Sequence, residues 1–145
     1  MKNEKRLMPP PLDKTSAEFN RQLICDLLNE GALQALLDLG TDDASWQHQG
    51  EICKNKDEIA ELLSKRNQRL LHYRWHSTIW NYSEERLSLQ IVSEWQHCSS
   101  GQWYRSNGQL LLSFNESALI TGAVSTSQDH KISADSRELF KPQYA

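Results

Sequence analysis

The chain has 145 residues, of which 38% are hydrophobic and 24% are charged, and its formal net charge at pH 7 is -3. A chain of this length predicts one domain that buries roughly two-thirds of its unfolded surface. The charge balance excludes the strong basic excess of a nucleic-acid-binding domain, and no apolar run approaches the ~20 residues of a membrane span.

The three cysteines, Cys25, Cys53 and Cys98, are odd in number and have no C-x-x-C spacing. This pattern favours reduced thiols over a disulfide framework or a zinc site. We therefore expect a soluble cytoplasmic protein with no nucleic-acid or membrane partner. A weak basic stripe, made of Lys54, Lys56, Lys65, Arg66 and Arg69, is most simply the solvated face of a helix.

Residues 1–14 contain a charged start and three consecutive prolines, which predicts an extended arm that packs on the body or remains mobile. A single domain is expected over 15–130 and a tail over 131–145. The first helix is expected to begin at Thr15, which forms a capping-box pattern with Glu18, and to end at Gly31. Its buried residues are predicted to be Phe19, Leu23, Ile24, Leu27 and Leu28.

A short second helix is expected over 32–39, followed by two short strands between 42 and 53 with Trp46 and His48 on one face. A third helix is predicted from Asn55, whose capping-box partner is Glu58. Its buried side contains Ile59, Leu62, Leu63 and, one turn further on, Arg66. Arg66 either extends past the end of the core towards solvent or closes one end of an internal pocket with its guanidinium.

From residue 71 onward the hydrophobic period changes from helical to two. Strands are predicted over 71–82, 86–97, 102–115 and 119–127, joined by short turns as an antiparallel meander. The first of them carries Tyr73 and Trp75 on one face and Trp80 on the other, so both faces need cover. Helices cover only one, so we expect a homodimer through the open face, or a wrapping of that face by residues 129–145.

The stretch 94–107 is predicted to form the tip of a long hairpin. A two-residue loop at Ser100–Gly101 places Leu89 opposite Leu112 and Ile91 opposite Leu110. A four-residue loop preserves the same faces, because side chains alternate with a period of two. One face then carries Trp95, His97 and Tyr104 near the tip, and the other carries Glu94, Trp103, Arg105 and Asn107. Both faces are bulky, so the pattern leaves open which one faces inward.

Helices followed by a twisted antiparallel sheet give an α+β order with the helices on one side of the sheet. The run Glu94–Trp95, then 101–106 and Gly108, resembles the signature of a bacterial and fungal family known as domain of unknown function 1348. That family is part of the nuclear transport factor two-like, or SnoaL-like, group. The resemblance covers nearly the whole chain, including Trp46, Lys65–Arg66, Tyr73–Arg74, Trp80, Arg86, Asp129, Ile132 and Arg137.

This resemblance implies a cone of the cystatin-like superfold, in which a curved antiparallel sheet wraps round three helices and encloses an internal pocket, commonly in a homodimer. The wider group includes ketosteroid isomerases, scytalone dehydratase, limonene epoxide hydrolase and polyketide cyclases, together with members that only bind. The chain departs from the family at Gln47, His48 and Gln49, where arginines are usual, which favours a less charged ligand. The fold alone does not choose the function.

Glu94 is the strongest candidate for a catalytic carboxylate, because Arg105 on the facing strand can keep it ionised as a base. The alternative is a cross-strand salt bridge with a structural role. Tyr73 and His97 are candidates for proton transfer or for orienting a carbonyl. Ligand-binding residues are predicted from their aromatic or polar character near these groups: Trp46, His48, Arg66, Trp80, Trp95, Trp103, Tyr104 and Asn107.

No cofactor or metal is predicted. His72 and His76 have the spacing of a helical metal pair but fall on a strand, where they are too far apart. No glycine-rich phosphate loop or nucleophile elbow is evident. The sequence thus supports two hypotheses. The first is a dimeric cone that binds a small organic molecule, with isomerase, dehydratase or hydrolase chemistry through Glu94, Arg105 and a tyrosine. The second is a non-catalytic binding or interaction module.

Overall fold

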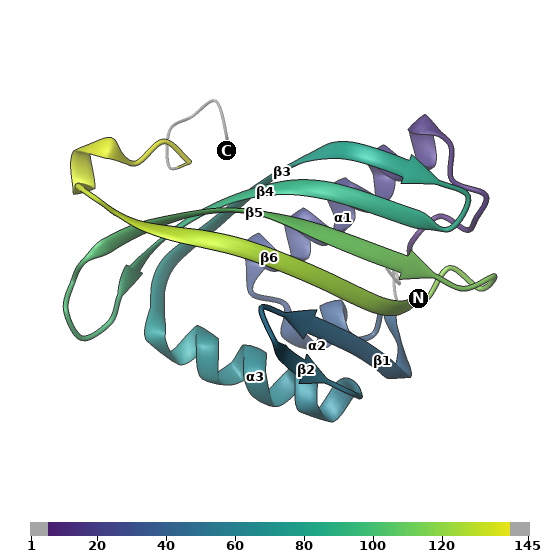
Figure 1. Cartoon of the computed structure of the whole chain (residues 1–145), viewed down its shortest axis with the longest axis horizontal. Helices are drawn as coiled ribbons and strands as arrows, with labels where there is room; N and C mark the ends of the chain where they lie inside the picture. The colour runs from purple at the N-terminus through teal and green to yellow at the C-terminus, as the bar shows by residue number, and fades with distance from the viewer. Residues whose placement is uncertain (1–5, 140–145) are drawn as a thin grey trace, which may run out of the picture.

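The structure, a computed structural model, describes residues 6–139; the outer ends of the predicted arm and tail, 1–5 and 140–145, lie outside the described residues. It contains one six-stranded sheet in the order β2-β1-β6-β5-β4-β3, with its helices on one face (Figure 1). The elements are α1 (Lys14–Glu30), α2 (Leu33–Leu37), β1 (Gly40–His48), β2 (Glu51–Cys53), α3 (Lys56–Arg69), β3 (Leu70–Ser83), β4 (Arg86–His97), β5 (Trp103–Phe114), β6 (Ile120–Ile132) and a 3-10 turn η1 (Ala134–Ser136). The predicted α+β order is confirmed.

The N-cap of α1 is Asp13, two residues earlier than predicted. Its side chain accepts a hydrogen bond from the Ser16 backbone N–H at 2.8 Å, and the Ser16 hydroxyl accepts one from the Asp13 N–H at 2.9 Å. Asp13 and Ser16 have the same three-residue spacing as Thr15 and Glu18, and aspartate is an equally strong cap. The predicted start of α3 is confirmed, since the Asn55 side chain accepts from the Glu58 N–H at 2.9 Å.

The buried side of α1 centres on Asn20, which is fully buried and joins the arm to the helix. Its amide accepts from the Met8 N–H at 2.7 Å and donates to the Met8 carbonyl at 3.2 Å. Phe19 lies at the edge of this face and is 49% exposed, so its predicted burial is wrong. In the part of the arm that the structure describes, Leu7 and Leu12 are buried in the core, which shows that this part packs on the body.

The hairpin of β4 and β5 has a four-residue turn, residues 98–101, closed by hydrogen bonds between His97 and its neighbours across the turn. Leu89 therefore pairs with Leu110 and Ile91 with Gly108, two residues away from the predicted register. A shift of two preserves side-chain parity, so the predicted division of the hairpin into two faces holds.

The sheet extends beyond the predicted four-stranded meander, because β1 pairs with β6 and β2 pairs with β1. Strand β6 continues to Ile132, five residues beyond its predicted end, and pairs antiparallel with β5. Its other edge pairs in parallel with β1, which places Trp46 beside Ala123 and His48 beside Ser125. This parallel pair, which the sequence did not predict, brings the first and last strands together (Figure 1).

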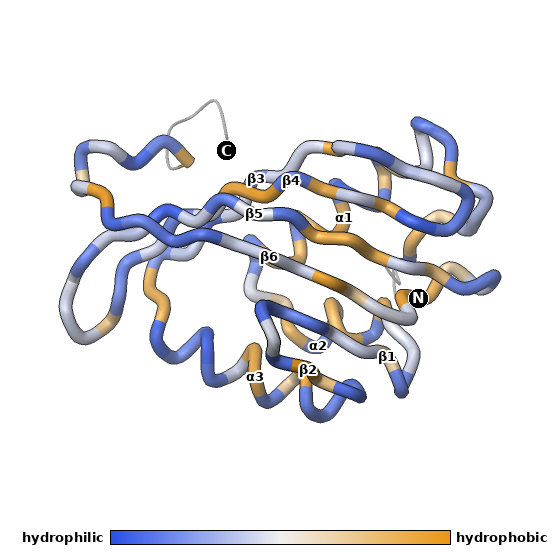
Figure 2. The backbone as a smooth tube through the Cα atoms, viewed as in Figure 1, coloured by the Kyte–Doolittle hydropathy of each residue, from blue (hydrophilic) through white to orange (hydrophobic). Residues whose placement is uncertain are grey.

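We call the face that carries the helices the inner face and the opposite one the outer face. Apolar residues concentrate in the central part of the sheet and on α1, while the strand ends near the hairpin tip are hydrophilic (Figure 2). The core joins the inner face of β4 and β5 to α1, with Leu27, Leu87 and Leu89 almost completely buried. Within residues 6–139, no helix is long and apolar enough to cross a membrane.

Candidate functional site

A cavity of about 530 Å³ lies between the inner face of the sheet and helix α3. Its helical wall is apolar and includes Ile59, Leu62 and Leu63, which are only half-buried because they face this space. No residue of α3 is fully buried, in contrast to α1, whose apolar side packs directly on the sheet. The pattern that predicted the buried side of α3 thus identified a cavity wall.

The floor of the cavity carries a polar row that crosses four strands. Trp75 pairs with Ser93, Ser93 with Ser106, and Ser106 with Asp129, so all four side chains share the inner face. All four line the cavity, and Ser93 and Ser106 are almost completely buried. Asp129, towards the edge of the sheet, remains exposed at the mouth. A carboxylate and two hydroxyls are therefore aligned on one side of the cavity.

An aromatic wall borders this row on the side of the hairpin tip. Trp95 and Tyr104, paired across β4 and β5, stack with ring centroids 5.7 Å apart and an interplanar angle of 15°. Tyr73 lies 6.2 Å from Trp95 and 6.0 Å from Trp75. His97 lines the same cavity, and its Nδ1 lies 2.9 Å from the Ser99 hydroxyl of the turn. Aromatic rings in offset contact form a rigid surface on which a planar ligand can pack.

Arg66 extends from α3 towards the sheet, where its Nη2 donates a hydrogen bond to the Tyr73 hydroxyl. Its Cζ also lies 5.0 Å from the centroid of the Tyr73 ring. Burial raises the pKa of Tyr73 to about 12, although the Arg66 charge and a hydrogen bond with Ser93 act in the opposite direction. Tyr73 is consequently a neutral phenol at physiological pH. Of the two alternatives for Arg66, the structure shows the one in which it lines the cavity.

On the opposite side of the cavity, two residues of β1 converge on Ser125 of β6. The Trp46 indole N–H donates to the Ser125 hydroxyl at 2.8 Å, and His48 Nδ1 lies 2.7 Å from the same oxygen. The two rings are 5.8 Å apart, so this contact fixes both on the inner face.

The structure separates the twelve predicted site residues into two groups. Those that line the main cavity are Trp46, His48, Arg66, Trp95, His97 and Tyr104. Tyr73 lines a smaller adjoining cavity of about 310 Å³, which shares Arg66 and Trp75 with the first. The remaining five residues are absent from the walls of both cavities.

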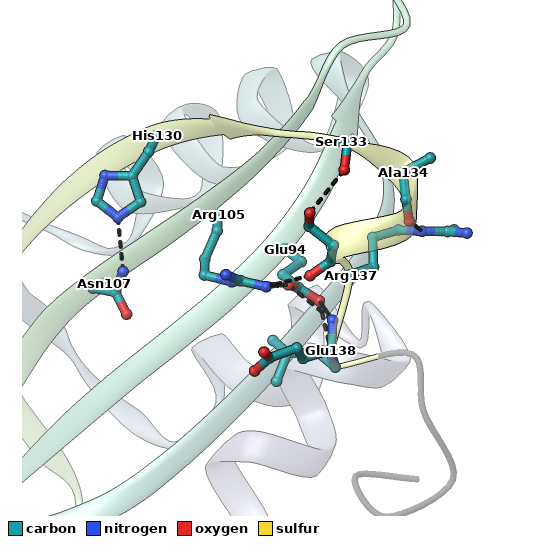
Figure 3. Close-up of polar contacts among 10 residues, drawn as sticks. Glu94, Arg105, Asn107, His130, Ser133, Ala134, Arg137 and Glu138 are labelled. Carbon is teal, nitrogen blue, oxygen red and sulfur yellow. Dashed lines mark hydrogen bonds and ion pairs between the residues drawn. The ribbon is translucent and has the colours of Figure 1, made fainter.

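Glu94 and Arg105 lie on the outer face, so the hypothesis that they face the pocket is wrong. Glu94 is 0% exposed, and its carboxylate accepts hydrogen bonds from Arg105, from the Glu138 N–H at 3.0 Å and from the Leu139 N–H at 2.7 Å (Figure 3). Arg105 also donates to the Ser136 carbonyl at 2.7 Å. The pair therefore attaches residues 133–139 to the sheet, which agrees with the structural alternative.

The same parity places Trp103 and Asn107 on the outer face. Arg137 lies over the Trp103 ring with its Cζ 4.5 Å from the centroid, and Asn107 is hydrogen-bonded to His130 (Figure 3). Trp80 is 61% exposed at a register irregularity in β3 and lines neither cavity. These three residues therefore lie away from the walls of both cavities.

The predicted site residues did not include Ser93 or Ser106, and Asp129 was expected to cap a turn rather than to reach the pocket mouth. Residues Ala123, Ser125, Ser127 and Asp129 alternate regularly and share the inner face in the structure. That alternation was the available sign, but the strand was predicted to end at 127, which left Asp129 in a turn. Among the described residues, no group of three or more His, Cys, Asp or Glu side chains has the arrangement of a metal site.

Several solved structures have a fold similar to that of this chain. The epoxide hydrolase/cyclase-like enzyme SalBIII, described with a role in pyran ring formation in the polyether salinomycin, superposes with a TM-score of 0.70 at 10% identity, over 83% of this chain and 98% of its own. A candidate polyketide cyclase from Xanthomonas campestris pv. campestris gives 0.66 at 19% identity, over 76% and 88%. An NTF2-like protein from Burkholderia xenovorans LB400 gives 0.61 at 12% identity, over 72% and 83%.

These identities are low, so the structural likeness establishes the fold and leaves the reaction open. The search of curated proteins found no match. Residues 10–140 match the sequence profile of the family described as "Protein of unknown function (DUF1348)". The chain thus belongs to the DUF1348 family and has the NTF2-like, or SnoaL-like, fold.

Proposed function

We propose that the chain binds a small, largely apolar organic molecule in the 530 Å³ cavity and acts on it by cofactor-free acid–base chemistry. The observation that carries the proposal is the division of the cavity into an apolar helical wall and a polar floor that ends at Asp129. The volume falls within the roughly 300–1,000 Å³ typical of small-molecule sites. Enzymes named among the structural relatives supply two reaction classes, cyclase and epoxide hydrolase.

In this proposal Asp129, rather than Glu94, is the base. Its side chain faces the cavity mouth, whereas the carboxylate of Glu94 is occupied by four donors on the outer face. Ser106 pairs with Asp129 across the sheet and Ser93 with Ser106, so two hydroxyls lie where a substrate oxygen could accept hydrogen bonds. Proton transfer between a carboxylate and a carbon or oxygen of the substrate is the chemistry that such an arrangement supports.

The first experiment is native mass spectrometry of protein purified under mild conditions, which reports subunit number and any retained molecule together. A defined extra mass supports the binding cavity and identifies a chemical lead for assays. The decisive variant is Asp129→Asn, compared with Asp135→Asn on the outer turn. Loss of turnover with unchanged ligand affinity in Asp129→Asn alone supports catalysis. Unchanged turnover in that variant would reject Asp129 as the base.

The alternative function, a binding module without catalysis, is favoured by the structural role of Glu94. It predicts that a ligand recovered from the protein remains chemically unchanged after prolonged incubation, and that Asp129→Asn alters only affinity. Product analysis by mass spectrometry separates the two functions.

The proposed assembly is a homodimer formed through the outer face. Leu111 pairs with Val124 across β5 and β6. On its other side Leu111 pairs with Ser88 of β4, which in turn pairs with Asn81 of β3. Asn81 directly follows Trp80. Val124 and Trp80 are exposed, and together with Leu111 they would form an apolar strip for this contact. A second copy related by two-fold symmetry would bury the strip against itself. Val124→Lys should then yield monomers in light-scattering measurements, whereas Ile52→Lys, an exposed position on β2, should leave the dimer intact.

A further inference from the structure

The charged guanidinium of Arg66 is the group in the cavity that most restricts the chemistry of the ligand. Its side chain is half-buried, and the described residues provide one hydrogen-bond partner, the Tyr73 hydroxyl. Among residues 6–139, no carboxylate lies within ion-pair distance of its guanidinium, whereas Lys56, also in the wall, lies 3.5 Å from Asp42. The contact with Tyr73 adds no negative charge beside the guanidinium, because the phenol is neutral.

An uncompensated guanidinium beside apolar walls is costly unless a negative group approaches it. Arginine presents five donors in a planar fork, of which the described contacts use one, and the fork fits a carboxylate with two parallel hydrogen bonds. Leu63 and Leu70 line both cavities together with Arg66 and give this charge apolar neighbours. The site is thus built for one anionic group attached to a hydrophobic body.

A second donor in the same part of the cavity lacks a partner within residues 6–139. The Trp75 indole Nε1 is buried and has no hydrogen-bond partner among the described residues. Buried donors of this kind are rare in folded proteins, and an acceptor brought by a ligand or a water molecule is the usual explanation. Trp75 and Arg66 line both cavities, so the unsatisfied indole lies in the same region as the proposed carboxylate position.

The geometry points to a monocarboxylic acid with an apolar body as the ligand class, bound with its carboxylate at Arg66. This inference rests on the proposed function of the cavity and specifies its substrate. Ser93, which lies beside Tyr73, and Asp129 are separated by two strand spacings, or roughly 10 Å. A ligand of about that length would place its far end at Asp129.

The test compares acids with neutral molecules of the same shape, namely 4-phenylbutanoate with 4-phenylbutanamide and octanoate with octanamide. Titration calorimetry at constant ionic strength measures each dissociation constant on the intact protein. We expect at least one acid to bind about 10-fold or more tightly than its amide, as befits a charge-assisted pair. Arg66→Gln should abolish this preference and Arg66→Lys should retain part of it. Lys65→Gln, on the exposed side of the same helix, should not affect it.

Equal binding of acid and amide, or a preference that persists in Arg66→Gln, would overturn the inference and leave the proposed binding function intact. Failure of both acids and both amides to bind would count against the proposed function itself and against the inference with it. Thermal unfolding of each variant establishes that it is folded. The acid–amide comparison on the unmodified protein does not depend on any variant.

Discussion

The Nη2 atom of Arg105 lies 2.6 Å from Oε2 of Glu94, on the outer face of the sheet and beneath residues 136–139. The second oxygen of Glu94 accepts from the backbone N–H groups of Glu138 and Leu139. A carboxylate with this many donors is fixed in place, because each buried donor would lose its partner if the side chain moved. The relationship assigns Glu94 to the attachment of the C-terminal segment.

Glu94→Gln should therefore lower stability and release this segment. Removing one member of a buried ion pair costs about 3 kcal/mol, because the remaining charge is left uncompensated. We expect that loss in urea denaturation and faster hydrogen exchange at the Leu139 amide, with ligand affinity unchanged. Glu138→Gln is the control, since only its backbone contacts Glu94. A stable Glu94→Gln protein that has lost its ligand would contradict this assignment.

Tyr73 should ionise only at an unusually high pH. Burial raises its pKa to about 12, against about 10 in an unfolded chain. Because the folded value is the higher one, the associated stability is fully present below pH 10 and is lost as the pH rises from 10 to 12. Absorbance at 295 nm should show one late tyrosine, which Tyr73→Phe removes and guanidinium chloride returns to the ordinary range. A late tyrosine that persists in Tyr73→Phe would refute the assignment.

The core and the cavity wall should respond differently to truncation. Leu89 is 1% exposed in the packed core, so Leu89→Ala should cost about 2–5 kcal/mol. Leu62 faces the cavity and is already half-buried, so Leu62→Ala should cost about 1 kcal/mol and mainly weaken ligand binding. Chemical denaturation measures both. Equal costs at the two positions would mean that α3 packs as tightly as α1.

Gly108→Ala should be among the most damaging single-methyl additions. A Cβ at this position would lie 2.0 Å from the Thr126 carbonyl oxygen and 2.9 Å from the Ser127 Cα. Both atoms are backbone, so β5 and β6 would have to separate, at a cost of about 3 kcal/mol. Gly122→Ala is the matched control in the same sheet, because its nearest neighbour is the Ser45 hydroxyl at 3.4 Å. The melting temperatures of the two variants measure this difference, and Gly108→Ala should show the larger decrease.

Much of the fold could be predicted because hydrophobic periodicity tolerates local errors. The hairpin turn has four residues instead of two, yet the division of side chains between Trp95 and Glu94 holds, because a shift of two preserves parity. Helix α3 was located by Asn55 and Glu58, a cap that depends on neighbouring residues alone. The parallel contact of β1 with β6 joins segments about 75 residues apart, and no local pattern encodes it.

The site was predicted less well because both faces of the hairpin carry aromatic and charged residues. Trp103 and Arg105 have the composition of a pocket, but the C-terminal segment covers them, and its position follows from tertiary contacts such as that of Arg137 with Trp103. Asp129 was expected to cap a turn because the last strand was predicted to end at 127, whereas β6 continues to Ile132. What selects the inner face is the placement of α3, which periodicity does not specify.

The parallel pairing of β1 with β6 also constrains how the protein reaches this structure. Residues 40–48 emerge from the ribosome long before residues 120–132, so the small β1–β2 hairpin must wait for nearly the whole chain before it gains its neighbour. Contacts of such long sequence separation form slowly, because the intervening loop must first be closed. The cavity that holds Trp46 and His48 should thus be completed last, and β1 is the strand most exposed to mispairing while synthesis continues.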